Sequence, residues 1–252
     1  MPTAAPPLDA YKHLRRGENP TLRLLNRPES AIATGAVSDV IDWLGRAVAS
    51  GHFPIGATLP MENQLGERVG VSRTVIREAV KVLTAKGVLK TARRYGTVVN
   101  PLDDWNLLDA DIVSWHKKGD GQVNLIFREL VQLLSIMLPQ SVDAALNRLP
   151  AQMNDLSDMA VSVLQSHDAA PEQRLQAEFT IWVQILEAPQ SSMFRQFKAL
   201  TYEMIRLTQE FEEQPSRSDV LYSDLLRHIS SGNGDEANLS CRLILARSKS
   251  LM

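Results

Sequence analysis

Apolar residues recur at helical spacing along most of this 252-residue chain, and the pattern predicts a mainly α-helical protein. Residues 71–83 show it clearly, with one apolar stripe formed by Ile76, Ala79, Val80 and Leu83. The opposite side of this predicted helix is polar and basic. Ser72 stands where an N-cap is expected, because its hydroxyl can accept a hydrogen bond from an unpaired backbone N–H.

Other elements are predicted on both sides of this helix. The pattern places helices at 38–50 and 60–69 before it, and β-prone runs at 88–91 and 97–99 after it. A turn of a few residues joins the second helix to the third, which is the helix-turn-helix arrangement. The two β-prone runs flank a tip that holds Arg93 and Arg94. Three helices followed by a basic-tipped hairpin predict a winged helix-turn-helix.

From residue 122 onward the chain has helical periodicity and almost no strand signal. The predicted segments are 122–146, 151–166, 171–187, 191–212, 217–231 and 235–251. Gly, Pro and Asn separate them, so the C-terminal part is predicted to be an all-α helical bundle with short connections.

A motif in residues 36–100 closely resembles the GntR family of bacterial transcription regulators. It consists of Phe53, Pro54, Gly56, Leu59, Pro60, Glu62, Leu65, Val71, Ser72, Arg73, Val75, Ile76, Arg77, Glu78, Ala79, Leu83, Gly87, Gly96, Thr97 and Val99. Residues 105–115 resemble the start of the effector domain in FadR-type members, particularly galactonate-type repressors. The resemblance implies a DNA-binding repressor with an FCD-type (FadR C-terminal) helical domain.

Four regions follow from these patterns. Residues 1–30 are rich in proline and arginine and are predicted to be a disordered arm. Residues 31–100 form the winged helix-turn-helix, and Pro101 and two aspartates mark a linker at 101–104. Residues 105–252 form the FCD-like effector-binding and dimerisation domain.

The net charge of −2 conceals an uneven distribution. Residues 36–100 carry nine Lys and Arg against five Asp and Glu, whereas residues 101–252 carry 13 against 21. A basic module joined to an acidic one favours a polyanionic partner for the first alone. The single Cys241 excludes an intramolecular disulfide and suits a reducing cytoplasm. The sequence predicts neither a membrane span nor a secretion signal.

Several polar residues of the motif are candidates for DNA contact. Arg can bridge guanine O6 and N7, and the resemblance implies base contacts by Arg73 and Arg77. The remaining candidates are Ser72, Thr74 and Lys81 for phosphate, Arg93 and Arg94 for a minor groove, and Asn63, where relatives often carry Arg. The alternatives are an intrahelical pair for Arg77 and a plain solvated tip for the hairpin.

In the C-terminal domain, many FCD relatives bind a metal through one Asp and three His. Their Asp-x-x-Phe-His pattern is replaced by Gln176, Ala177, Glu178, Phe179 and Thr180, and the next His position falls at Tyr222. We therefore expect no metal and no cofactor. A polar pocket for an organic or sugar acid is expected from Arg128, Gln132, Gln176, Thr180, Arg206 and Tyr222. The alternative is that these polar residues bind no ligand.

No catalytic motif accompanies these patterns: there is no Gly-rich phosphate loop and no GxSxG. The preferred function is a DNA-binding regulator whose bundle senses a carboxylate metabolite. The alternatives are a regulator whose bundle only dimerises or binds a protein, and an enzymatic bundle with an accessory DNA-binding domain. GntR-like operators are palindromes, which predicts a homodimer, with the helix at 191–212 or its neighbours at the interface.

Overall fold

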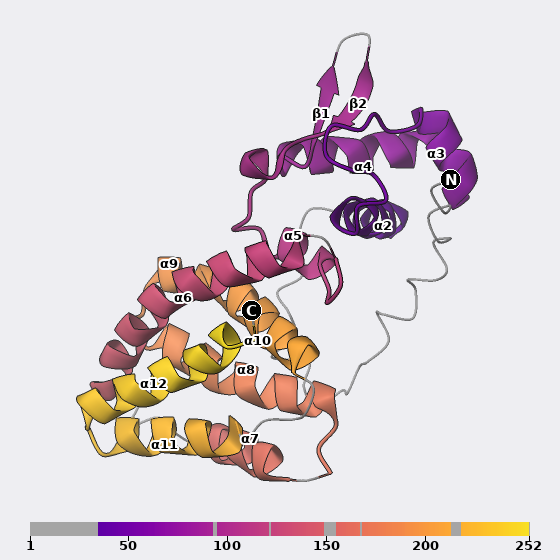
Figure 1. The fold of residues 1–252 in the computed structure, drawn as a ribbon. Helices are drawn as coiled ribbons and strands as arrows, with labels where there is room; N and C mark the ends of the chain where they lie inside the picture. The colour runs from indigo at the N-terminus through magenta and orange to yellow at the C-terminus, as the bar shows by residue number, and fades with distance from the viewer. Residues whose placement is uncertain are drawn as a thin grey trace. The chain divides into compact units, whose positions relative to one another are not determined.

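A computed structural model describes residues 35–92, 95–120, 122–148, 155–166, 168–212 and 218–251. The arm predicted at residues 1–30 therefore lies outside the described residues. The chain divides into two compact units, residues 1–123 and 124–252, each of which is considered by itself (Figure 1).

The first unit contains the predicted helices and hairpin. They are α2 (Ala36–Ala49), α3 (Glu62–Val69), α4 (Arg73–Ala85), β1 (Leu89–Ala92) and β2 (Gly96–Val99). The apolar stripe of α4 is buried together with residues of α2 and β1, and Leu44, Ile76 and Leu83 have no exposed surface. The prediction of a winged helix-turn-helix is thus confirmed, because the stripe packs inward and leaves the polar face of α4 in solvent.

The ends of these helices follow local rules. Ser72 is the N-cap of α4, and its Oγ accepts a hydrogen bond from the N–H of Val75 at 3.4 Å. Gly70 adopts φ 75° at the end of α3, a left-handed conformation that glycine reaches without strain. The first helix begins at Ala36 after Gly35, two residues earlier than the position of Ser38 suggests, so Ser38 lies inside the first turn.

The wing is an antiparallel hairpin in which Leu89 is paired with Val99 and Ala92 with Gly96. The preceding loop adds to it, because Thr58 forms a bridge with Val98 on the other side of β2. Buried Leu89 and Val99 join the hydrophobic core at the base of the hairpin. The base of the hairpin is therefore anchored to the hydrophobic core.

Residues 101–116 belong to the first unit rather than to a separate linker and second domain. They contain a 3-10 helix (Leu102–Asp104) and α5 (Ala110–Trp115), and Asp109 caps the start of α5. The Trp115 ring covers Gly45 of α2 so closely that a Cβ there would lie 2.3 Å from the ring. Trp115 Nε1 also donates to Asp42 at 3.2 Å.

A buried lysine ties this segment to α4. Lys86, directly after α4, is 5% exposed and forms ion pairs with Asp109 and, at 3.0 Å, with Asp111. Burial alone would lower the pKa of Lys86, but its hydrogen bonds to the two carboxylates outweigh burial and raise it. We call residues 101–116 the strap, since they close over the end of α4.

The second unit consists of helices, as predicted. They are α6 (Val123–Leu146), α7 (Asp155–Gln165), α8 (Pro171–Glu187), α9 (Ser192–Gln196), α10 (Lys198–Phe211), α11 (Ser218–Ser230) and α12 (Gly234–Lys249). One predicted segment, 191–212, is divided by a turn at Phe197 into α9 and α10. The all-α bundle is therefore confirmed.

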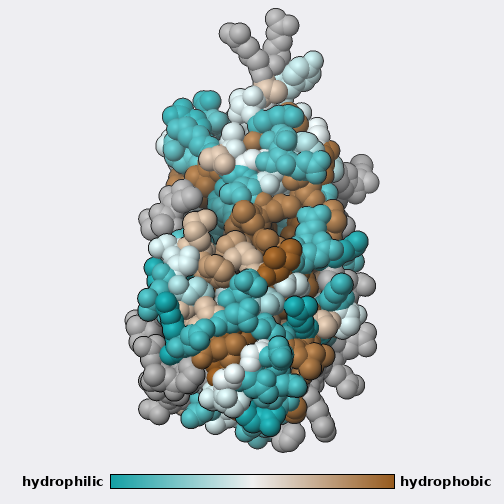
Figure 2. All heavy atoms as spheres, turned by 90° about the vertical axis from the view of Figure 1, so that its left-hand side faces the viewer, coloured by the Kyte–Doolittle hydropathy of each residue, from teal (hydrophilic) through white to brown (hydrophobic). Residues whose placement is uncertain are grey.

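By length and composition, α6 is apolar enough to cross a membrane, and half of its apolar stretch is buried inside the protein. Core helices of soluble proteins pass the same test, so this property is weak support for a membrane span. Ile136, on its outer side, is 73% exposed. Figure 2 shows hydrophobic residues interspersed with hydrophilic ones on one face of the protein.

Candidate nucleic-acid interface

The exposed face of α4 is the centre of the candidate interface. Ser72, Arg73, Thr74, Arg77 and Lys81 are all exposed, on the side opposite the buried stripe. The structure thus brings together the helical residues that the motif predicts for DNA contact.

Arg73 is held by a residue of the preceding helix. Its Nε donates to Glu62 Oε2 at 2.9 Å, and the Arg73 side chain is still 73% exposed. Glu62 is the first residue of α3. Sequence reasoning included Glu62 only as part of the family motif and missed this contact, because the two residues are eleven positions apart.

The other candidates differ in their surroundings. Lys81 Nζ donates to Glu78 Oε1 at 2.9 Å, and this hydrogen bond lowers the pKa of Glu78. No hydrogen bond from Arg77 is found in the described part of the chain, but its charge also contributes to lowering the pKa of Glu78, so the intrahelical pair stays an alternative. Asn63 is exposed on α3, beside Glu62.

At the wing, Arg93 and Arg94 lie outside the described residues. Tyr95, which follows them, is 73% exposed. A large aromatic side chain in solvent at a hairpin tip is a further candidate for contact with DNA sugar or base. The sequence analysis did not select Tyr95, because it chose candidates at the hairpin tip by charge.

The arrangement suits nucleic-acid binding by two kinds of contact. Arg73 and Arg77 are one helical turn apart and can present guanidinium groups to base edges in a major groove. Ser72, Thr74 and Lys81 can donate to phosphate oxygens, which fixes register without reading sequence.

The residues predicted to bind an effector are not gathered in one place. Arg128 and Gln132 are exposed on the outer side of α6, which does not fit the expectation that they share one polar pocket with buried Thr180 and Tyr222. Thr180 is buried, and its hydroxyl donates to the backbone carbonyl of Gln176 at 2.7 Å. Arg206 is engaged by Glu203 and Glu210 along its own helix.

Tyr222 belongs to a buried polar cluster that the sequence did not predict. Its hydroxyl accepts from Trp182 Nε1 at 2.9 Å and donates to Glu178 Oε2 at 3.1 Å. Burial, followed by the charge of Glu178, raises the pKa of Tyr222 well above its usual value, so the hydroxyl stays protonated.

Arg247 of α12 completes this cluster. Its Nε and Nη2 donate to the two carboxylate oxygens of Glu212 at 2.5 and 2.8 Å, and its Nη1 reaches Glu178 Oε2 at 3.3 Å. Burial alone would lower the pKa of Arg247, but the bond to Glu212 and the charge of Glu178 raise it. One buried guanidinium therefore holds two carboxylates from α8 and the end of α10.

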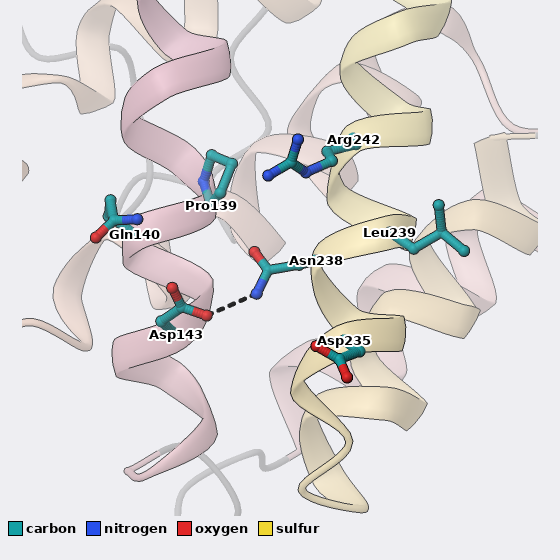
Figure 3. A pocket seen from close by; sticks show the side chains of 7 residues that line it. All are labelled: Pro139, Gln140, Asp143, Asp235, Asn238, Leu239 and Arg242. Atoms are coloured by element: carbon teal, nitrogen blue, oxygen red, sulfur yellow. Dashed lines mark hydrogen bonds between the residues drawn. The ribbon is translucent and has the colours of Figure 1, made fainter.

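A hollow of about 390 Å³ lies elsewhere in the second unit, between α6 and α12 (Figure 3). It is lined by Pro139, Gln140, Asp143, Asp235, Asn238, Leu239 and Arg242. Asn238 Nδ2 donates to Asp143 Oδ1 across it at 2.6 Å. None of the predicted effector residues lines this hollow.

No group of three or more His, Cys, Asp or Glu residues is placed to hold a metal ion in the described part of the chain. The expectation that the protein binds no metal remains a prediction.

The fold and the exposed basic helix together define a winged helix-turn-helix DNA-binding domain. Residues 36–99 match the family model of bacterial regulatory proteins, gntR family. This chain therefore carries a GntR-family helix-turn-helix domain.

Two relatives from Escherichia coli K12 extend the match beyond that domain. The uncharacterized HTH-type transcriptional regulator YieP is 37% identical over 125 residues, which cover 46% of this chain and 54% of that protein. The galactonate operon transcriptional repressor is 30% identical over 145 residues, which cover 52% of this chain and 63% of the repressor. The matched part thus spans between about half and two thirds of these curated relatives.

A solved structure has a similar fold. The structure of Lar, described as controlling expression of the Listeria monocytogenes agr system, is 16% identical. The alignment covers 87% of this chain and 97% of the Lar chain, with a TM-score of 0.56. At this identity the likeness concerns the fold alone.

Proposed function

We propose that this protein is a sequence-specific DNA-binding transcription regulator that acts as a repressor. The observation that carries the proposal is the exposed face of α4, where Arg73 and Arg77 stand one turn apart above a buried apolar stripe. The nine Lys and Arg in residues 36–99, against five Asp and Glu, favour attraction to DNA. Relatives named as transcriptional regulators support the same function.

In this proposal Arg73 and Arg77 read base edges in a major groove. The phosphate contacts come from Ser72, Thr74, Lys81 and Asn63, and the wing enters a minor groove through Arg93 and Arg94. The partner is double-stranded DNA with a palindromic operator, bound by a homodimer. No catalytic step is proposed, and the relatives bear the names of regulators rather than of enzymes.

Selection of tight-binding duplexes from a random library with the parent protein would provide an operator probe. Arg73→Ala and Arg77→Ala should each weaken binding of that probe by about 1–3 kcal/mol at fixed salt, and relax the base preference. Lys81→Ala should weaken binding to all duplexes alike and reduce the salt slope by about 1.

Arg227→Ala is the control, because Arg227 is an exposed arginine of α11. The proposal fails if no sequence is enriched, or if both α4 variants bind the selected duplex as tightly as the parent does.

The second unit is proposed to sense a small organic-acid or sugar-acid metabolite. The galactonate repressor supports this choice of ligand class by its name. Arg128 is exposed, so the buried guanidinium of Arg247 is a stronger candidate than Arg128 for binding the carboxylate of the ligand. The ligand would have to compete with Glu212, which pairs with Arg247 in the structure. Gln176, Thr180, Arg206 and Tyr222 are the other proposed contacts.

The alternative is a bundle that only dimerises or binds a protein partner. Thermal unfolding with galactonate and related acids, compared with galactose as the uncharged control, separates the two. A melting temperature that rises with an acid but not with galactose supports sensing of an acid. No rise with any acid tested favours the alternative.

A further inference from the structure

Glu62 stands in an unusual position for a carboxylate in a DNA-binding surface. It lies at the start of α3, yet its Oε2 accepts a hydrogen bond from Nε of Arg73 at the start of α4. Within the described residues, Arg73 has no other hydrogen bond. The Nη1 and Nη2 atoms, which form the outer edge of the guanidinium, are therefore left for another partner.

The geometry that joins these two residues is fixed by the turn. A Cβ on Gly66 would lie 2.7 Å from the carbonyl oxygen of Val71, so the two helices meet more closely than any other residue would allow. Gly70 reverses the chain with φ 75°. At the other end of α3, Gln64 Oε1 accepts from the N–H of Met61 at 3.2 Å and secures the first turn that carries Glu62.

The bond has a chemical consequence for Arg73. A guanidinium that reads guanine uses two parallel N–H groups, one to O6 and one to N7. When Nε is bonded to Glu62, the edge of the guanidinium formed by Nη1 and Nη2 faces away from the carboxylate. The bond to Glu62 thus sets the direction of this edge. An arginine side chain that is already oriented loses less conformational freedom when it binds.

Stability does not account for the pair. Exposed ion pairs contribute little to folding, and the Arg73 side chain is 73% exposed. The charge of Glu62 also opposes DNA in general, because a carboxylate near the groove repels phosphate. Glu62 therefore has two effects of opposite sign: it weakens attraction to any duplex and orients the arginine for one base.

We infer that Glu62 is a positioning residue that sets the sequence specificity of Arg73. It raises the preference for the operator over unrelated DNA rather than the affinity for DNA as such. This inference rests on the proposed function, since it requires Arg73 to read a base.

The test compares Glu62→Gln with Glu67→Gln in the full chain. Both variants remove one negative charge from α3, and Glu67 is exposed. The probes are the duplex selected with the parent protein and an unrelated duplex of equal length, at one salt concentration. Melting temperatures of the variants and the parent are measured alongside.

Glu67→Gln should tighten binding to both duplexes by a similar small factor. Glu62→Gln should tighten binding to the unrelated duplex by a similar factor but weaken binding to the selected duplex by about 5- to 30-fold. This is part of the roughly 5- to 150-fold in affinity that a bidentate base contact contributes. In an Arg73→Ala background, Glu62→Gln should no longer weaken the selected duplex. Melting temperatures should stay the same.

Equal tightening of both duplexes by Glu62→Gln would overturn the inference, because the carboxylate would then act by charge alone. Weakening of both duplexes together with a lower melting temperature would also overturn it, in favour of a structural role. A parent protein that does not distinguish the two duplexes overturns the proposed function, and this inference with it.

Discussion

At the scale of single residues, the buried guanidinium of Arg247 is the charge on which the polar cluster of the second unit depends. Its side chain is 11% exposed, and the two carboxylates that it holds, Glu178 and Glu212, are 2% and 9% exposed. Two carboxylates for one guanidinium leave an excess negative charge, and Tyr222 partly offsets it by donating a hydrogen bond. Removing the guanidinium would leave both carboxylates without a countercharge.

Arg247→Met is expected to lower the free energy of unfolding by about 3–5 kcal/mol at neutral pH, as for other broken buried ion pairs. Urea unfolding at neutral pH measures the effect. Arg227→Met is the exposed control, and should change stability by less than about 1 kcal/mol. A loss for Arg247→Met as small as that of the control would contradict the expected role of the buried ion pairs.

At the scale of elements, the strap couples α4, the helix proposed to read DNA, to the chain that follows it. Lys86, at the end of α4, is held by two aspartates of the strap, and the carbonyl of Lys86 accepts from the N–H of Asn106 at 3.0 Å. Trp115 fixes the other end of the strap against α2. A change in the position of the strap would therefore act directly on α4.

The raised pKa of Lys86 defines when this ion pair acts. A lysine whose pKa is higher in the folded than in the unfolded state stabilises the fold fully below the unfolded value, about 10.4. That stabilisation is lost as the pH rises through the folded value. At neutral pH the ion pair is therefore fully formed.

Lys86→Met should lower the free energy of unfolding by about 3–5 kcal/mol at neutral pH, because Asp109 and Asp111 are left without their countercharge. It should also weaken binding of the selected duplex without changing the salt slope, since Lys86 is buried and does not meet phosphate. Adding Asp109→Asn and Asp111→Asn should recover most of the stability, as Asn also caps a helix. Lys90→Met, an exposed control on β1, should leave stability unchanged. Failure of the triple variant to recover would argue against the ion pair.

At the scale of the whole molecule, the expected homodimer requires a self-complementary surface. The sequence pointed to residues 191–212, but α10 is largely buried within its own unit. The outer sides of α6 and α12 offer more, with Ile136 73%, Leu239 50% and Leu243 47% exposed. Asp235 and Arg242 lie on the same side of α12, so antiparallel α12 helices could pair them reciprocally across a two-fold axis.

Ile136→Glu with Leu243→Glu should convert a dimer into a monomer at micromolar concentration, measured by light scattering. Met193→Glu is the matched control, because Met193 is 71% exposed on α9, in the region that the sequence analysis expected at the interface. It should leave the dimer intact. If Met193→Glu alone disrupts the dimer, the interface includes α9 instead. A monomeric parent protein would contradict the predicted homodimer.

The sequence by itself determined the elements and the DNA-binding class. Helical periodicity, the Ser72 cap and the glycine turn are local properties, so the stripe of α4 and the basic face opposite it could be predicted from spacing. The same reasoning placed the bundle helices, apart from the turn at Phe197 that divides one of them.

Tertiary structure alone decided which charges far apart in the sequence meet. Glu62 and Arg73, Lys86 and Asp111, and Glu178 and Arg247 are 11, 25 and 69 positions apart, and no periodicity connects them. Whether Arg128 faces inward or outward also depends on how the helices pack. Long-range ion pairs form only after packing has brought elements together, so the strap, the oriented arginine and the buried cluster could not be predicted from the sequence.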